Sequence, residues 1–113
     1  MKKIIAVPAD NGGVCVHFGH CPYFAVYVVD DQNILEERKL NAPPHQPGLL
    51  PAWLKEKEVT DIIACGMGQR AIDLFNQSGI NVIVGVEPSK QISTLVNEYL
   101  EGKLSGGGNY CDH

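Results

Sequence analysis

Residues 61–71, with the sequence DIIACGMGQRA, form the stretch that decides the fold class. The apolar run at 61–65 is typical of a central strand in a parallel sheet. The turn GMG at 66–68 follows it, and residues 69–78 then predict a helix that Gly79 ends. A buried strand that leads through a tight turn into a helix indicates an α/β protein.

The elements on either side of this stretch predict a mixed sheet. Three strands precede it as a meander, while helix, strand, helix, strand and helix follow in alternation, so one side of the sheet is antiparallel and the other parallel. Right-handed crossovers place the later strands beside the first strand. We therefore expect a ribonuclease-H-like three-layer fold with a mixed five-stranded sheet and helices packed on it. The other predicted strands are 3–8, 23–29, 34–40 and 81–86, and the other predicted helices are 49–57 and 89–100.

The chain is expected to form one domain. Its 113 residues match one ordinary domain, which we place at 1–104, and such a domain can bury a core without staples. Residues 105–113 include three consecutive glycines and predict a flexible C-terminal tail.

Composition excludes several classes of protein. The net charge is −4 and no basic run exists, which argues against binding to nucleic acid or to an anionic membrane. No apolar run approaches the ~20 residues that span a bilayer, and the short apolar stretch at 4–7 is not a signal peptide. We expect a cytoplasmic protein whose four cysteines are free thiols or metal ligands. Of these, Cys15 and Cys65 lie in apolar strands and are expected to fill the core.

The stretch HFGHC at 17–21 contains the strongest candidates for metal binding. His17, His20 and Cys21 are soft or borderline ligands, which suit zinc, copper, iron and iron–sulfur species. Gly19 would allow the backbone to bend so that both histidines point inward. The alternative is that these residues have only structural roles.

Two further segments carry ligand-type side chains. His45 lies in a loop with three prolines, which would hold it with little conformational freedom. Cys111 and His113 follow the triglycine and could close over a bound metal. A solvent-exposed loop histidine and a disordered tail are the alternatives.

Residues 66–71, GMGQRA, also match the pattern G-x-G-x-x-A of dinucleotide-binding turns. Glu87 lies where a ribose-binding acid would be expected. Free backbone N–H groups at the helix start, beside Arg70, would favour an anion. A nuclease is not expected, because Asp10 has no partner carboxylate at the end of the neighbouring strand.

Three of these segments together resemble one known family, the dinitrogenase iron–molybdenum cofactor biosynthesis proteins. The resemblance covers nearly the whole chain and identifies it as similar to the small stand-alone members. The segments that carry it are HFGHCPYF at 17–24, HQPGLLPAWL at 45–54 and GMGQRA at 66–71.

The resemblance implies a ribonuclease-H-like domain that binds, stores or delivers an anionic metal–sulfur cluster. The cluster would contain iron, molybdenum or both, and a cluster-assembly or acceptor protein would be the partner. No enzymatic activity is implied. The implied cluster-binding residues are His17, Gly19, His20, Cys21, His45, Gly66, Met67, Gly68 and Arg70, and the candidate direct metal ligands are His20, Cys21, His45, Cys111 and His113.

Three other functions stay open at this point. The first is a simple zinc or iron site built from His20, Cys21, Cys111 and His113. The second is a nucleotide-binding module that uses residues 66–71, and the third is a protein-interaction domain in which the histidines are incidental.

Overall fold

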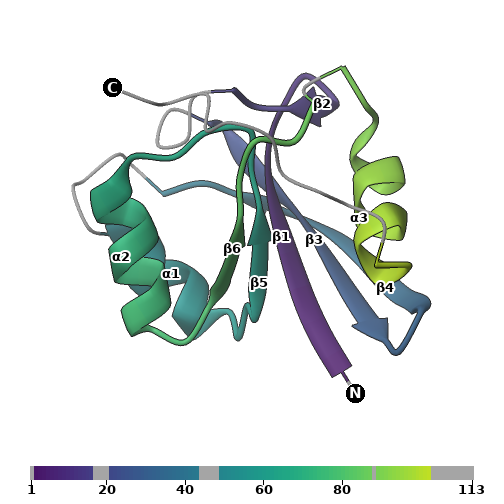
Figure 1. Ribbon diagram of the computed structural model, residues 1–113, viewed down its shortest axis with the longest axis horizontal. Coiled ribbons are helices and arrows are strands. Elements are labelled where there is room, and N and C mark those ends of the chain that lie inside the picture. Colours follow the sequence, from purple (N-terminus) through teal and green to yellow (C-terminus); the bar gives the residue numbers. More distant parts are fainter. Residues whose placement is uncertain (1, 17–20, 44–48, 88, 103–113) are drawn as a thin grey trace.

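The computed structural model describes residues 2–16, 21–43, 49–87 and 89–102, and its sheet lies between two helical layers (Figure 1). The predicted α/β class is confirmed. The strands are β1 (Lys2–Asp10), β2 (Gly13–Val14), β3 (Tyr23–Asp30), β4 (Asn33–Asn41), β5 (Asp61–Ile63) and β6 (Asn81–Ile83). The helices are α1 (Leu49–Glu56), α2 (Gln69–Gln77) and α3 (Ile92–Leu100).

Strand β1 lies at the centre of the sheet, whose order is β4-β3-β1-β5-β6. It pairs antiparallel with β3 and parallel with β5, and β5 pairs parallel with β6. This is the mixed ribonuclease-H-like arrangement that the sequence predicts. The chain leaves β1 toward β3 on one side and later returns to β5 on the other, so the strand order switches between β1 and β5.

The sheet has six strands and not the predicted five, because β2 pairs with the end of β1. Asn11 and Gly12 have φ angles of 56° and 86°, and these two residues form a two-residue hairpin turn. The chain therefore folds straight back, and Val14 lies opposite Ala9.

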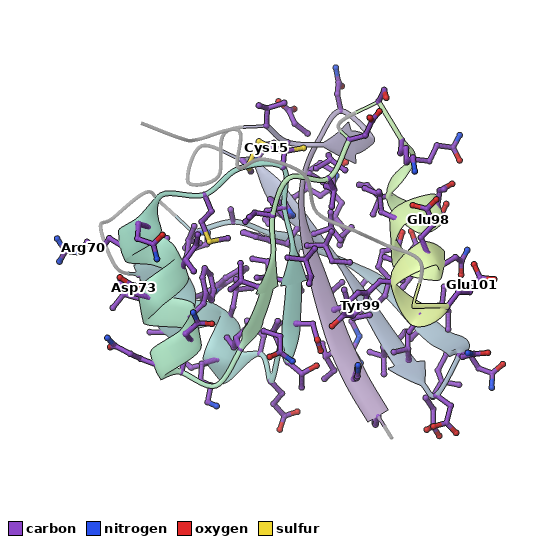
Figure 2. All side chains as sticks on the ribbon, in the orientation of Figure 1. Cys15, Arg70, Asp73, Glu98, Tyr99 and Glu101 are labelled. Carbon is purple, nitrogen blue, oxygen red and sulfur yellow. A yellow bond between two sulfur atoms is a disulfide. The ribbon has the colours of Figure 1, made fainter. Side chains whose placement is uncertain are left out.

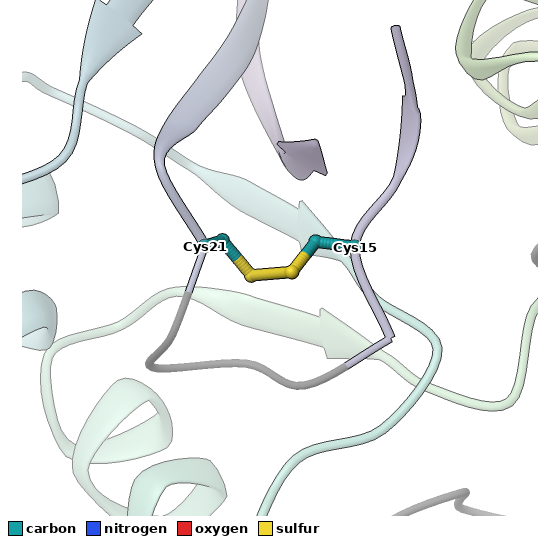
Figure 3. Close-up of a disulfide and its surroundings, with 2 residues drawn as sticks. All are labelled: Cys15 and Cys21. Atoms are coloured by element: carbon teal, nitrogen blue, oxygen red, sulfur yellow. A yellow bond between two sulfur atoms is a disulfide. The ribbon is translucent and has the colours of Figure 1, made fainter. Parts of the chain in front are cut away.

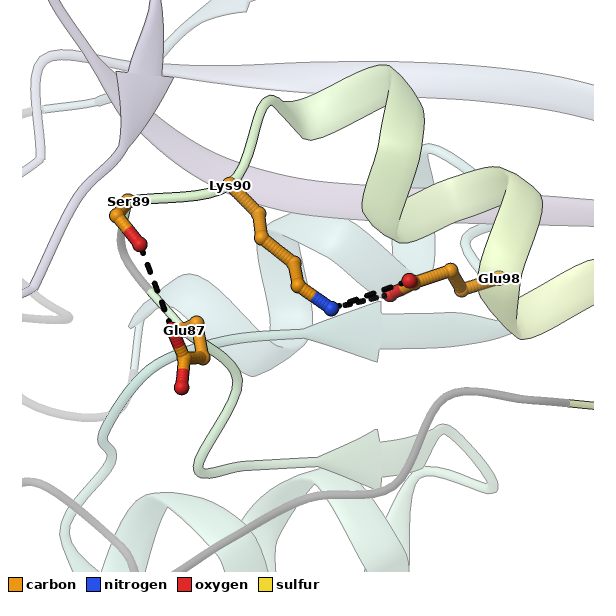
Figure 4. Close-up of polar contacts among 4 residues, drawn as sticks. All are labelled: Glu87, Ser89, Lys90 and Glu98. Atoms are coloured by element: carbon orange, nitrogen blue, oxygen red, sulfur yellow. Dashed lines mark hydrogen bonds and ion pairs between the residues drawn. The ribbon is translucent and has the colours of Figure 1, made fainter.

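Strands β5 and β6 are shorter than predicted, and α3 starts later. Beyond β5 the chain stays attached by single hydrogen bonds, from Ala64 N–H to the Ile83 carbonyl (2.8 Å) and from Gly85 N–H to the Cys65 carbonyl (2.8 Å). Before α3, Lys90 N–H donates to the Glu87 carbonyl and forms a turn. Figure 4 shows the Lys90 ammonium against the Glu98 carboxylate, 3.1 Å away, which ties this turn to the helix.

Alternate residues of β1 face two separate hydrophobic cores. Ile5, Val7 and Ala9 belong to the core under α3, whereas Ala6 belongs to the core under α1 and α2. This period of two is what a strand requires when both faces of its sheet are covered. The α3 core also contains Tyr27, Cys65, Leu95 and Val96, and the other core also contains Phe24, Leu54, Met67 and Phe75.

A buried carboxylate connects the edge of the sheet where β5 begins to α3. Asp61 is 1% exposed and accepts hydrogen bonds from the Thr60 hydroxyl (2.6 Å), the Asn81 amide (3.3 Å) and the Tyr99 hydroxyl. Burial, and then the hydrogen bond to Asp61, raise the pKa of Tyr99 above its ordinary value. The network therefore fixes α3 against β5 and β6.

Across the described residues, no helix is both long and apolar enough to cross a membrane.

Candidate functional site

Several loops meet at the edge of the sheet where β1, β5 and β6 end. The β1–β2 turn follows β1, and the turn at residues 66–68 follows β5 and leads into α2 (Figure 1). Because β1 and β5 are parallel neighbours, their carboxyl ends lie side by side. This is the switch point at which open α/β sheets bind ligands.

A disulfide bond joins Cys15 and Cys21 at this edge (Figure 3). Cys15 follows β2 and Cys21 precedes β3, and their Cα atoms are 5.9 Å apart. The expectation that both are free thiols is therefore corrected. The physical reason is that β2 and β3 both pair with β1, at Ala9, and this pairing brings the two cysteines together.

The other predicted core cysteine, Cys65, is buried, as expected. Cys65 has no exposed surface and lies in the core under α3. Cys15 is also buried, but it is bonded to Cys21, and its pairing was missed. The signal available in the sequence was the separation of only six residues between the two cysteines, with a tight turn just before them.

The turn at residues 66–68 has one exposed residue. Gly66 is buried, and the Met67 side chain is fully buried in the core under α1 and α2. Gly68 is exposed, caps α2 with φ −64° and ψ 151°, and has no atom within 4 Å of where a Cβ would lie. A ligand at this turn could therefore reach backbone N–H groups, but not the Met67 side chain.

Arg70 is exposed on the first turn of α2, which contains no acidic residue. Figure 2 shows its side chain projecting outward, away from Cys15. The guanidinium group therefore adds positive charge near the helix start without pointing at the disulfide.

Glu87, which the sequence placed where a ribose-binding acid would be expected, lies in the turn that precedes α3. Its carboxylate is exposed and accepts a hydrogen bond from the Ser89 hydroxyl at 3.4 Å (Figure 4). This contact belongs to the turn that precedes α3.

The remaining predicted ligands lie outside the described residues and stay predictions. Among the residues that are described, no group of three or more histidine, cysteine or acidic side chains could hold a metal ion. The undescribed candidates are His17, Gly19, His20, His45, Cys111 and His113.

A cleft of about 650 Å³, not predicted from the sequence, lies between β3, β4 and the start of α3. Tyr23 and Tyr27 line it, the Lys39 ammonium lies 4.4 Å from the Tyr23 ring centre, and the Tyr27 hydroxyl donates to Glu37 at 3.3 Å. Burial, and then the charge of Glu37, raise the pKa of Tyr27 to about 12. The cleft shares Gly12 with the β1–β2 turn, so it lies beside the edge described above.

Comparison with known proteins supports the same fold and family. The family model described as dinitrogenase iron-molybdenum cofactor matches residues 1–102. The uncharacterized protein MJ0580 of Methanocaldococcus jannaschii is 32% identical over 106 residues, which cover 88% of this chain and 87% of that protein.

Two solved structures share the architecture. The crystal structure of PH0822 has a TM-score of 0.87 and 27% identity, and the match covers 97% of this chain and 99% of that one. The apo form of the orange protein from Desulfovibrio gigas has a TM-score of 0.75 and 17% identity, over 95% of this chain and 94% of that one. The second likeness concerns the fold alone. Because the family model spans nearly the whole chain, the protein belongs to the dinitrogenase iron-molybdenum cofactor family.

Proposed function

We propose that this protein binds, stores or delivers an anionic metal–sulfur cluster, containing iron, molybdenum or both, as a carrier or accessory protein. The cluster is cargo, and the protein performs no catalytic step of its own. Membership of the iron-molybdenum cofactor family supports a role in handling such cargo. The partners that this role requires are a protein that assembles the cluster and one that accepts it.

The observation that carries the proposal is the exposed amino end of α2 at the switch point of the sheet. Gly68 leaves open space there, and the first N–H groups of a helix have no partner within the helix. These N–H groups and the helix dipole favour a negative charge. The absence of an acidic side chain in the first turn of α2 leaves that preference uncancelled.

The overall charge of the protein does not attract an anion. The net charge is −4, so attraction must come from this local feature and from nearby cationic or hydrogen-bonding groups. Arg70 supplies one such charge at the start of α2. His17, His20 and His45 are the other groups that the sequence predicts.

Partial ligation suits a carrier, because cargo must also leave. A closed four-ligand cage releases its metal slowly, whereas hydrogen bonds with one or two direct bonds hold a cluster reversibly. We therefore assign direct ligation to His20 or, once its disulfide with Cys15 is reduced, to Cys21, and positioning to the backbone of the 66–68 turn.

An anaerobic titration of the full chain with tetrathiomolybdate, a small anionic metal–sulfur species, tests the proposal by its absorption spectrum. In Gly68→Val, two added methyl groups and a β-carbon fill the space above the turn, and we expect affinity to fall by about tenfold. The matched control is Gln77→Val, which places the same side chain at the exposed opposite end of α2 and should bind like the wild type.

Two more variants test the direct ligands. At least one of the variants His20→Ala and Cys21→Ala should weaken binding, because we assign direct ligation to one or both of these residues. Unchanged affinity in both variants, together with unchanged affinity in Gly68→Val, would sink the cluster-carrier proposal. Stoichiometric zinc without sulfide in anaerobically purified protein would instead support a simple metal site.

A further inference from the structure

Cys15 and Cys21 are held close together by the sheet as well as by their own bond. Val14 lies opposite Ala9 in β2, and Cys15 N–H donates to the Pro8 carbonyl at 2.9 Å. On the other side, Tyr23 lies opposite the same Ala9 at the start of β3. The two cysteines are therefore anchored to one short segment of β1.

A second set of contacts fixes the same segments. The Tyr23 hydroxyl accepts a hydrogen bond from Gly12 N–H at 2.9 Å, which ties the β1–β2 turn to β3. The Pro22 carbonyl accepts one from Ala42 N–H at 3.0 Å, which ties the start of β3 to the end of β4. None of these contacts involves a sulfur atom, so they persist when the disulfide is reduced.

We propose that the Cys15–Cys21 pair is a redox-gated metal site. A dithiol reductant transfers two electrons and two protons to the disulfide, so that the S–S bond breaks, two thiols form and the dithiol becomes a disulfide. The two thiols then bind one thiophilic metal ion as thiolates and release two protons. In the reverse step a disulfide oxidant accepts two electrons from the two thiolates and two protons from solvent and becomes two thiols, the Cys15–Cys21 bond re-forms, and the metal ion is released.

The geometry suits a single metal ion. Metal–sulfur bonds of about 2.3 Å in a tetrahedral site place two sulfur atoms about 3.8 Å apart. Starting from a bonded pair with Cα atoms 5.9 Å apart, side-chain rotation alone can open the sulfurs to this distance. Thiolate ligands select Zn²⁺, Cu⁺ and iron–sulfur species over Mg²⁺ or Ca²⁺.

The pair would provide two ligands and leave the other coordination positions open. No third histidine, cysteine or acidic side chain joins the two cysteines within the described residues. Open positions can be filled by sulfide, by a second protein or by solvent, which suits a metal that is passed on. The redox state of the pair would then control when the proposed carrier binds its metal cargo. In this respect the inference rests on the proposed function.

The other described cysteine provides an internal comparison. Cys65 is fully buried in the core under α3 and, within the described part of the chain, forms no disulfide. Cys65→Ala therefore removes one thiol without touching the proposed site.

The test is an anaerobic Co²⁺ titration of the full-length chain, because thiolate-to-cobalt charge transfer absorbs in the near ultraviolet. The chain is first oxidised to the disulfide, which is verified by mass spectrometry as the loss of two hydrogen atoms, and a portion is then reduced with dithiothreitol that is removed before titration. We expect the charge-transfer band in the reduced chain only. Cys15→Ser and Cys21→Ser should each lose about half the band or more and at least about tenfold in affinity, whereas Cys65→Ala should match the wild type.

Three results would overturn the inference. They are an oxidised chain that retains all four thiols, a reduced chain without the band, and a Cys15→Ser variant that matches the wild type. Circular dichroism of each variant separates loss of ligation from loss of folding. The outcome is independent of tetrathiomolybdate binding: cobalt binding without cluster binding would defeat the carrier proposal alone, and cluster binding that ignores the state of the disulfide would defeat the gate alone.

Discussion

The Tyr99 hydroxyl in α3 donates a hydrogen bond to the buried carboxylate of Asp61, which lies 38 residues earlier at the start of β5. The Thr60 hydroxyl and the Asn81 amide donate to the same carboxylate. A buried charge is stable only when such partners replace the water that it loses. This one carboxylate therefore couples α3 to two parallel strands.

We predict that Asp61→Ala destabilises the fold by ~3 kcal/mol, because it leaves buried donors without an acceptor. Tyr99→Phe should cost ~1–2 kcal/mol, since it removes one donor to a charged group and leaves the others. Urea denaturation followed by circular dichroism measures both. Glu56→Ala, which removes an exposed carboxylate at the end of α1, should stay within ~0.5 kcal/mol of the wild type. An Asp61→Ala variant as stable as this control would show that the network does not stabilise the fold.

Reduction of the disulfide should lower stability modestly. The bond closes a loop with a sequence separation of only six residues. The chain-entropy relation assigns such a short loop ~2 kcal/mol. We therefore expect the urea midpoint of the wild type to fall on reduction, while the Cys15→Ser/Cys21→Ser double variant shows no further fall. A fall of equal size in the double variant would assign the effect to the reductant and not to this bond.

Two glycines at the ends of α2 should respond differently to the same substitution. Gly79 has φ +79°, a conformation in which a β-carbon is strained, so Gly79→Ala should cost ~1 kcal/mol. Gly68 has φ −64° and open space around it, so Gly68→Ala should change stability by less than ~0.5 kcal/mol. Thermal or urea unfolding of the two variants in parallel decides this. Equal losses would mean that φ does not determine the cost.

Alkaline pH should destabilise the protein through its buried tyrosines. Burial and Glu37 raise the pKa of Tyr27 from 10.0 to about 12 in the folded state. Since the folded state holds the proton more tightly, the stabilisation is complete below pH 10 and is lost as pH rises toward 12. We expect a smaller loss of urea stability between about pH 9 and about pH 11 in Tyr27→Phe than in the wild type. Identical losses in the two proteins would contradict this assignment.

Much of the fold follows from patterns within short segments. The apolar strand before Gly66 and the helix that ends at Gly79 could be predicted because their boundaries are set by neighbouring residues. The continuous apolar run within β1 likewise predicts a buried strand. The central place of β1 follows from the handedness of crossovers.

Other features depend on contacts between distant residues. The return strand β2 exists only through its pairing with β1. The same pairing brings Cys15 close to Cys21, and these two cysteines, six residues apart in the sequence, form a disulfide. Asp61 is one of thirteen acidic residues in the sequence. Only its burial and its hydrogen bonds from Asn81 and Tyr99 distinguish it from the other twelve.

The candidate site was predictable in its place, but less so in its chemistry. The strand order fixes the edge between β1 and β5, and the 66–68 turn lies there as expected. Met67 is buried in the core and Arg70 points outward, because the direction of a side chain depends on how α2 packs on the sheet. The roles of His17, His20 and His45 remain predictions from sequence.

The central position of β1 has a consequence for synthesis of the chain. Strands β1, β3 and β4 are complete once residue 41 is made, whereas β5 follows about 1–4 s later at 5–20 residues per second. During this interval one edge of β1, at Ile5 and Ala6, has no neighbouring strand. Unpaired apolar edges are templates for pairing with other chains. The nascent protein is thus most exposed to aggregation on the ribosome between completion of its antiparallel half and arrival of its first parallel strand.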